Sequence, residues 1–339
     1  MASFRNDYGV LAHPKILEAI CKYGSEENTP YGHDSHSRNA AKAIRRAFGC
    51  PKSTDVHFLA GGTQTNMVVI SGLLRPYEAV ISCDSGHINV HETGAVEGQG
   101  TKVITVPAVD GKLSAAQIET VVKRHIDEHM VLPKMVYISD STETGTIYTK
   151  EELLQIRKAC DKYGLYLYID GARIGSALTC KACDHGPELI GQVADAFYVG
   201  GTKNGLPLGE ALVINNDELK PHFRHLTKNK GAMLAKGYLL GIEFEEAFRN
   251  DLYWKLARHA NEMAESLRNG LAELGFEPMP SPTNQVFLRL DKDRAEAIIA
   301  EFGCERWEAG EEEETIRFVT SFATDKEDLK RLFTFLQMI

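Results

Sequence analysis

The sequence predicts an α/β fold with a mostly parallel seven-stranded sheet between helices, followed by a small C-terminal α+β domain. Short apolar runs alternate with amphipathic stretches over residues 56–215. Several of these runs are apolar on both faces, which is typical of strands buried inside a parallel sheet. Beyond about residue 245 the pattern changes to a long helical stretch followed by alternating strands. These observations indicate a large layered domain and a smaller second one.

The seven expected strands are the short apolar runs at 56–60, 79–83, 102–106, 134–139, 165–170, 196–200 and 210–214. A helix over 64–74 is expected after the first of them. A helix over 150–163 is well marked, because Thr149 and Glu152 form a capping box and Gly164 stands where the helix ends. A strand, such a helix and a further strand imply a right-handed crossover in one sheet.

The C-terminal part is expected to form its own α+β unit. Its predicted elements are a helix over 245–274, strands over 285–290 and 315–319, and a closing helix over 325–338. The acidic run at 311–314 is most simply a solvated turn. We therefore expect three parts. Residues 1–14 form a segment that packs near the small domain and the active site, residues 15–245 form a large domain that carries the binding site, and residues 246–339 form a small domain.

Composition limits the classes of function. The 339 residues are 43% hydrophobic and 25% charged, as in an ordinary globular protein. The net charge of −9, with no basic stripe, argues against a nucleic-acid partner. Residues 1–10 lack the apolar core of a signal peptide and no apolar run is long enough to span a membrane, so we expect a cytoplasmic protein. The scattered, odd set of seven cysteines indicates free thiols.

Three predicted strands each end in a different chemical group. One runs into Gly61-Gly62-Thr63, the second ends in Asp170, and the third leads to Lys203. A glycine-rich turn before a helix can seat a phosphate on free backbone N–H groups. A buried carboxylate can pair with a protonated pyridine nitrogen, and a lysine amine can form a Schiff base. These are the groups that pyridoxal phosphate (PLP) needs from a protein.

Each member of this set also has a plainer structural interpretation. A Gly-Gly-Thr turn before a helix is more often only a turn, and this one matches neither the GxGxxG nor the P-loop pattern. Asp170 can be neutralised by Arg173 in a structural pair, or Arg173 can be free to bind a substrate carboxylate. Lys203 can be a strand-end lysine that extends into water. The order and strand-end placement of the three groups favour the PLP site.

His87 follows the strand at 79–83 and precedes His91 and Glu92. Two histidines four residues apart beside an acid suggest zinc, but the order is not HExxH and no third ligand follows. We therefore expect no metal, and a histidine that stacks on the cofactor and moves protons near neutral pH. The polar loop at 31–36 is either a surface turn or a flap over an active site, its own or a neighbour's.

The same residues belong to a wider pattern of matching stretches. They are Pro30-Tyr31-Gly32 with Asp34, Gly62-Thr63, Ser85 to Asn89, Gly94-Ala95, Thr142-Glu143 with Gly145, Ile169 to Arg173, Thr202 to Gly205, Glu210-Ala211 and Arg317 to Thr324. This pattern resembles the low-specificity L-threonine aldolases, and is most similar to their phenylserine-aldolase-like branch. The resemblance covers the chain from about residue 4 to its end, and implies the fold-type-I PLP-dependent transferase-like fold.

The resemblance also implies a role for each matching residue. Lys203 resembles the Schiff-base lysine, Asp170 the partner of the pyridine nitrogen, and His87 the stacking histidine. The other implied roles are phosphate binding for Gly62 and Thr63, contact with a neighbouring subunit's cofactor for Lys236, cofactor and carboxylate binding for Arg173, and substrate binding for Asn6, Tyr31, Glu143 and Arg317.

Two features depart from the family pattern. Asn6 stands where many members have serine, in the carboxylate site. Some members have a second active-site histidine near the region 141–143, and none occurs here. His87, Glu143 or a water molecule must then handle the proton of the substrate hydroxyl.

The implied function is a lyase that cleaves L-threonine, L-allo-threonine or related β-hydroxy-α-amino acids such as phenylserine to glycine and an aldehyde. A homodimer or homotetramer with shared active sites is implied as well. One alternative is a PLP-dependent β-eliminating lyase or aminotransferase on the same scaffold, since fold alone does not decide function. A different class of alternative is a non-catalytic PLP-fold binding partner, against which the intact Lys203, Asp170 and His87 argue.

Overall fold

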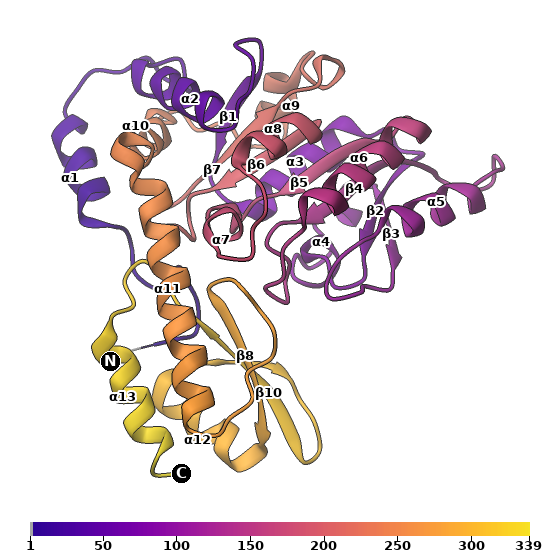
Figure 1. Cartoon of the computed structure of the whole chain (residues 1–339). Coiled ribbons are helices and arrows are strands. Elements are labelled where there is room, and N and C mark those ends of the chain that lie inside the picture. Colours follow the sequence, from indigo (N-terminus) through magenta and orange to yellow (C-terminus); the bar gives the residue numbers. More distant parts are fainter. Residues whose placement is uncertain (1–2) are drawn as a thin grey trace.

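A mostly parallel seven-stranded sheet forms the larger part of the computed structural model, which describes residues 3–339 (Figure 1). In the order β1-β7-β6-β5-β4-β2-β3, its strands are β1 (Asp55–Leu59), β7 (Glu210–Ile214), β6 (Ala196–Gly200), β5 (Tyr166–Asp170), β4 (Leu132–Ser139), β2 (Glu78–Cys83) and β3 (Lys102–Val106). All seven coincide with predicted strands to within two residues, so the α/β prediction is confirmed. The five strands from β6 to β3 pair in parallel.

β7 is antiparallel to both of its neighbours, β1 and β6. Those two strands therefore run in the same direction, and Leu59 and Gly200, their last residues, both pair with Glu210. The carboxyl ends of β1, β6, β5 and β4 consequently meet at one edge of the sheet. This edge is where α/β sheets bind ligands.

Helices cover both faces of the sheet because its strands carry apolar side chains on both faces. On one face pack α1 (Pro14–Tyr23), α2 (Ser35–Ala47), α5 (Ala115–Arg124), α6 (Lys150–Tyr163), α7 (Ile174–Thr179), α8 (Pro187–Val193) and α10 (Tyr238–Ala247). On the other pack α3 (Gly62–Leu73), α4 (His87–Val90) and α9 (Phe223–Asn229). Short 3₁₀ turns occur at η1 (Glu97–Gln99), η2 (Asp217–Leu219) and η3 (Arg249–Asp251). In β5 and β6, Leu167 and Phe197 face the first layer, whereas Tyr168 and Tyr198 face the second.

The capping prediction for α6 is confirmed in detail. Thr149 accepts a hydrogen bond from the backbone N–H of Glu152, whose carboxylate accepts one from the N–H of Thr149. Gly164 ends the helix at a φ of 64°, a left-handed conformation that glycine adopts without steric cost.

The long helix predicted over 245–274 is wrong in one respect, because the chain forms two helices there. α10 ends at Ala247, and α11 (Leu252–Glu273) begins after the η3 turn. Asn250 and Asp251 adopt left-handed φ values of 52° and 60°. Asparagine and aspartate tolerate this conformation better than other non-glycine residues. The helix can therefore break here without a glycine or proline, the residues by which a break is usually predicted from sequence.

A three-stranded antiparallel sheet forms the C-terminal part, in the order β8-β10-β9. Its elements are β8 (Gln285–Asp291), α12 (Lys292–Phe302), β9 (Glu305–Glu308), β10 (Glu313–Val319) and α13 (Lys326–Leu336), and α11 packs on them (Figure 1). The solvated turn predicted at 311–314 is partly wrong, because Glu313 and Glu314 begin β10. Glu314 is buried and accepts a hydrogen bond from Arg306 Nε at 2.7 Å.

The N-terminal segment lies against the small sheet before the chain reaches α1 (Figure 1). Phe4 donates its N–H to the carbonyl of Phe302 at 3.0 Å and accepts from the N–H of Val319 at 2.8 Å. Its ring is buried with the core of the small sheet. Residues 1–2 of the segment predicted over 1–14 lie outside the described residues. None of the helices within residues 3–339 has the length and apolar character needed to cross a membrane.

Candidate active site

Asp170 ends β5 as a buried carboxylate held by neutral donors. The Tyr137 hydroxyl donates to its Oδ2 at 2.7 Å, the Asn66 amide donates to Oδ2 at 2.9 Å, and the Ala172 N–H donates to Oδ1 at 3.0 Å. Burial by itself would raise the pKa of Asp170, but the charge of His87 and these hydrogen bonds bring the pKa below its ordinary value. Within residues 3–339 no lysine or arginine forms an ion pair with Asp170, so an anion is available to a cationic ligand.

Asn66, in the second turn of α3, connects Asp170 to Glu92. Its side-chain amide donates to Glu92 Oε1 at 2.7 Å as well as to Asp170, and its Oδ1 accepts from the Tyr168 hydroxyl at 2.8 Å. Glu92 in turn accepts from His87 Nδ1 at 2.8 Å. A continuous hydrogen-bonded network therefore links the sheet edge to His87.

This network leaves His87 with a distinct chemistry on each ring nitrogen. Burial would lower the pKa of His87, but the hydrogen bond to Glu92 and the charges of Glu143 and Asp170 outweigh it and raise the pKa. Because Nδ1 is engaged by Glu92, Nε2 is the nitrogen available to a ligand.

Lys203 lies half-buried three residues after the end of β6. Burial, and next the positive charge of Arg173, lower the pKa of its amine, although the nearby carboxylates of Asp7 and Glu143 oppose this shift. A lysine with a lowered pKa has a larger fraction of neutral amine, which is the nucleophilic form.

Arg173 pairs with Asp7, not with Asp170. Its Nε donates to Asp7 Oδ2 at 2.7 Å and its Nη2 donates to Oδ1 at 3.1 Å, and the Asn284 amide donates to Oδ2 at 2.9 Å. Within the described chain no hydrogen bond engages Nη1 of Arg173. The neighbouring Asn6 accepts only from the N–H of Tyr8, at 3.1 Å. Asp7 was not singled out from the sequence, because a lone aspartate near the N-terminus gives no signal of an arginine 166 residues away.

Arg317 reaches the same region from β10, and not all of its N–H groups have hydrogen-bond partners. It is buried, its Nη1 donates to Gln285 Oε1 at 2.8 Å, and its Nη2 donates to Glu305. Its Nε is buried without a partner. Burial, and then repulsion by Arg173, lower the pKa of Arg317. Within the described residues Nη1 of Arg173 and Nε of Arg317 have no hydrogen-bond partner, and guanidinium N–H groups of this kind can bind an anion.

Glu143 is buried in the loop after β4, on the same side of the sheet edge. Its charge acts on His87, Lys203 and Arg173. The structure thus brings together six of the predicted site residues, which are Lys203, Asp170, His87, Arg173, Arg317 and Glu143.

The N-terminus of α3 provides a second anion seat at the sheet edge. Gly61, the N-cap residue of α3, makes no side-chain hydrogen bond to the helix. The N–H groups of the first turn, including those of Gly62 and Thr63, therefore remain available to bind an anion. A Cβ atom at Gly62 would lie 3.0 Å from the Tyr198 hydroxyl, so a larger residue would force that side chain to shift. The Thr202 hydroxyl, next to Lys203, is buried without a partner.

These features fit PLP. The free N–H groups of α3 and the unpartnered Thr202 hydroxyl suit a phosphate, the buried Asp170 suits a protonated ring nitrogen, and the Lys203 amine suits an aldehyde.

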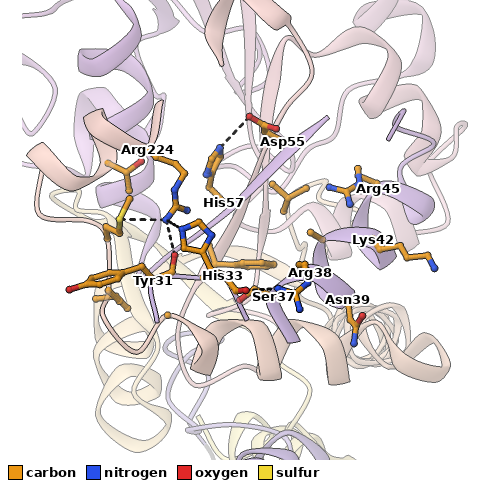
Figure 2. Close-up of a pocket in the computed structure, with 18 of the residues that line it drawn as sticks. Tyr31, His33, Ser37, Arg38, Asn39, Lys42, Arg45, Asp55, His57 and Arg224 are labelled. Atoms are coloured by element: carbon orange, nitrogen blue, oxygen red, sulfur yellow. Dashed lines mark hydrogen bonds and ion pairs between the residues drawn. The ribbon is translucent and has the colours of Figure 1, made fainter. Parts of the chain in front are cut away.

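Tyr31 and Lys236 lie elsewhere. Tyr31 lines a cavity of about 800 Å³ whose wall contains neither Lys203 nor Asp170 (Figure 2). Its backbone N–H donates to the Ala235 carbonyl at 3.0 Å, which brings the exposed Lys236 close to it. The cavity wall carries six lysine and arginine side chains and the single acid Asp55. The structure therefore separates these two residues from the Lys203 site of the same chain.

Comparison with known proteins shows the family to which the chain belongs. The family model described as β-eliminating lyase matches residues 13–293. The low-specificity L-threonine aldolase of a Pseudomonas species is 31% identical over 289 residues, which cover 84% of this chain and 83% of that protein. The chain belongs to the family described as β-eliminating lyase. The low-specificity L-threonine aldolase of Pseudomonas aeruginosa is 29% identical over 330 residues, covering 96% and 94% of the two chains.

A solved structure of Leishmania major threonine aldolase is similar over the whole fold. The TM-score is 0.97 at 44% identity, with 100% of this chain and 99% of that chain covered. Membership of the family confirms the predictions of fold type I, of PLP as the cofactor and of a carbon–carbon lyase acting on a small molecule.

Replacing Glu92 with glutamine is expected to lower the pKa of His87, because burial then acts against a weaker opposing interaction. The measurement is an NMR titration of histidine-labelled protein, with the His87 signal identified by its loss in His87→Asn. Glu97→Gln, at an exposed acid in η1, is the matched control and leaves the titration unchanged. An unshifted His87 pKa in Glu92→Gln would contradict the network.

Proposed function

We propose that the chain cleaves L-threonine, L-allo-threonine or related β-hydroxy-α-amino acids to glycine and an aldehyde. The observation that carries the proposal is the convergence at one sheet edge of a lysine with a lowered pKa, a buried aspartate and two arginines. The names of its relatives, low-specificity L-threonine aldolases, support the same substrate class.

The residues that we assign to the cofactor each match one part of it. Lys203 binds its aldehyde carbon, Asp170 its ring nitrogen, and Gly62 and Thr63 its phosphate, while His87 covers its ring. When bound, PLP supplies an electron-withdrawing ring that accepts the electron pair released as a bond to the substrate Cα breaks. Asp170, kept anionic by its neutral donors, holds the ring nitrogen protonated and so favours this withdrawal.

Arg173 and Arg317 bind the substrate α-carboxylate in this proposal. Asp7 accepts hydrogen bonds from Nε and Nη2 of Arg173. These two bonds fix the plane of the guanidinium and leave its Nη1 for the substrate. A carboxylate and an amine fixed at two points orient the bond between Cα and Cβ, and this orientation decides which bond breaks.

His87 and Lys203 carry the protons in this proposal. Nε2 of His87 accepts the proton of the β-hydroxyl, because Nδ1 is committed to Glu92. The ammonium form of Lys203 donates a proton to the substrate Cα before glycine leaves, and its lowered pKa makes this proton easier to release. Glu143 raises the pKa of His87 and thereby makes it a stronger base.

We also propose an oligomer, a homodimer or homotetramer, in which Tyr31 and Lys236 serve the active site of a neighbouring subunit. Both lie at the surface, away from Lys203 of their own chain. In the adjoining cavity Arg38 and Arg224 donate to the carbonyl oxygens of His33 and Tyr31, so their charges are not neutralised there (Figure 2). Such a basic face suits an acidic or phosphate-bearing surface.

β-Elimination is the second candidate function, because the matching family model carries that description. The two reactions differ in their products, since elimination yields a keto acid and ammonia and the aldolase reaction yields glycine and an aldehyde.

Incubation of the holoenzyme with L-threonine is expected to release acetaldehyde and glycine in equal amounts, and Lys203→Ala is expected to abolish turnover. Both products are measured in the same reaction, together with keto acid and ammonia. Lys181→Ala, at an exposed lysine paired with Glu265, is the matched control and retains activity. A keto acid with ammonia in place of glycine would replace the aldolase proposal by elimination.

Asp7→Asn is expected to raise KM about tenfold with a smaller change in kcat, because a charged bidentate bond that orients Arg173 is lost. Steady-state kinetics with L-threonine provide the measurement. Asp161→Asn removes an exposed ion pair with Arg157 and serves as the control. A lower KM in Asp7→Asn would instead mean that Asp7 competes with the substrate for Arg173.

Lys203→Ala and Tyr31→Ala are each expected to be impaired alone and to regain activity when their subunits are mixed. A mixed dimer contains one site with both natural residues, so recovery approaches about a quarter of wild-type activity. Lys203→Ala mixed with Asp170→Asn is the control. Because Lys203 and Asp170 serve the site of their own chain, no mixed dimer of these two variants contains an intact site. No recovery in the first mixture would show that Tyr31 does not act across subunits.

A further inference from the structure

Four side chains form a continuous row between α4 and the small sheet. The rings of His87 and His91 lie 5.4 Å apart, and the rings of His91 and Trp307 lie 5.9 Å apart. The guanidinium of Arg317 then lies 4.7 Å from the centre of the Trp307 ring. The row therefore starts at the histidine assigned to the cofactor and ends at an arginine assigned to the substrate carboxylate.

The two middle members, His91 and Trp307, have no part in the function proposed above. His91 is exposed and Trp307 is half-exposed, and Val90, which precedes His91 in the sequence, is 49% exposed. Behind Trp307 packs Phe287, with ring centres 5.3 Å apart. An accessible aromatic surface of this kind, backed by a further ring, is suited to an apolar group of a ligand.

Local structure directs Trp307 to this position. It lies in β9, where the register with β10 shifts between Thr315 and Ile316, so that Trp307 is the extra residue of a β-bulge. Bulges turn a side chain away from the regular alternation and are common beside active sites. Trp307 is thus held from the small sheet, whereas His91 is held from the large one.

His91 presents a neutral ring to the same space. Partial burial, together with repulsion by His87 and Arg317, lowers the pKa of His91 despite the attraction of Glu143. A neutral imidazole packs against an uncharged group without the desolvation cost that an imidazolium would carry.

We propose that His91 and Trp307 form the subsite that receives the β-substituent of the substrate. A β-hydroxy-α-amino acid has its carboxylate on Arg317 and Arg173, its amine at Lys203 and its hydroxyl at His87. The substituent on Cβ then extends from between His87 and Arg317, and the two rings that bridge those residues are His91 and Trp307.

The chemistry of the subsite selects for flat apolar groups. An aryl substituent, as in phenylserine, buries more apolar area against Trp307 than the methyl group of threonine does, and gains ring–ring contact with both residues. Trp307 and His91 therefore determine specificity, and they favour aryl over methyl substituents. This inference rests on the proposed function.

The test compares kcat and KM for L-threo-phenylserine and L-threonine in the wild type, Trp307→Leu and Trp307→Phe. In Trp307→Leu the ratio of kcat/KM for phenylserine to that for threonine is expected to fall about tenfold, mainly through KM for phenylserine. Trp307→Phe keeps an aromatic face and is expected to restore most of this ratio. The ratio cancels any loss that both substrates share through Arg317.

A binding measurement separates this inference from the reaction itself. The chain has two tryptophans, so Trp254→Phe leaves Trp307 as the only one. L-phenylalanine has no β-hydroxyl and is not cleaved, and its addition to this holoenzyme variant is expected to change the Trp307 emission. Glycine, which lacks a substituent, is the matched control and leaves the emission nearly unchanged.

The outcomes are distinguishable. An equal loss for both substrates in Trp307→Leu, or equal emission changes with L-phenylalanine and glycine, would overturn the subsite. A wild type that cleaves neither substrate yet shows the emission change with L-phenylalanine alone would overturn the proposed function and leave the subsite standing.

Discussion

The burial of the Asp170 carboxylate is the constraint on which the rest of the site depends. A carboxylate removed from water is costly unless donors replace the lost hydration. Here the donors are neutral, namely Tyr137 on the adjacent strand, Asn66 on α3 and a backbone N–H. They keep the group charged without neutralising it. A cationic ring nitrogen can therefore complete its environment, which no arginine or lysine of the described chain does.

The same arrangement fixes its surroundings. Asn66 reaches Asp170 only if α3 begins at the end of β1, and this start also directs the N–H groups of Gly62 and Thr63 to the sheet edge. The other hydrogen bond of Asn66 holds Glu92, which orients His87. One amide side chain thus links Asp170 to Glu92 and, through Glu92, to His87.

The substrate side of the site combines three cationic side chains with three carboxylates. Arg173 is paired with Asp7, Arg317 is paired with Glu305, and the charge of Glu143 acts on Lys203. After burial, the positive charge of Arg173 is the main cause that lowers the pKa of both Arg317 and Lys203. In the proposed function, the substrate carboxylate relieves the repulsion between the two guanidinium groups when it binds them. Asp7 and Asn284 keep Arg173 in place meanwhile, one from the N-terminal segment and the other from beside the small sheet.

The sequence alone determined the seven strands and the groups at their ends, because short apolar runs, capping boxes and glycine turns are local signals. Lys203, Asp170 and Gly62 could be predicted for that reason. Only the tertiary structure decided the partners of those groups. Asp7 on Arg173, Asn66 between Asp170 and Glu92, and Trp307 beside His91 join residues far apart in the chain. Hydrogen bonds and ring contacts act over a few ångströms in space, and no local pattern records which distant segments the fold brings within that range.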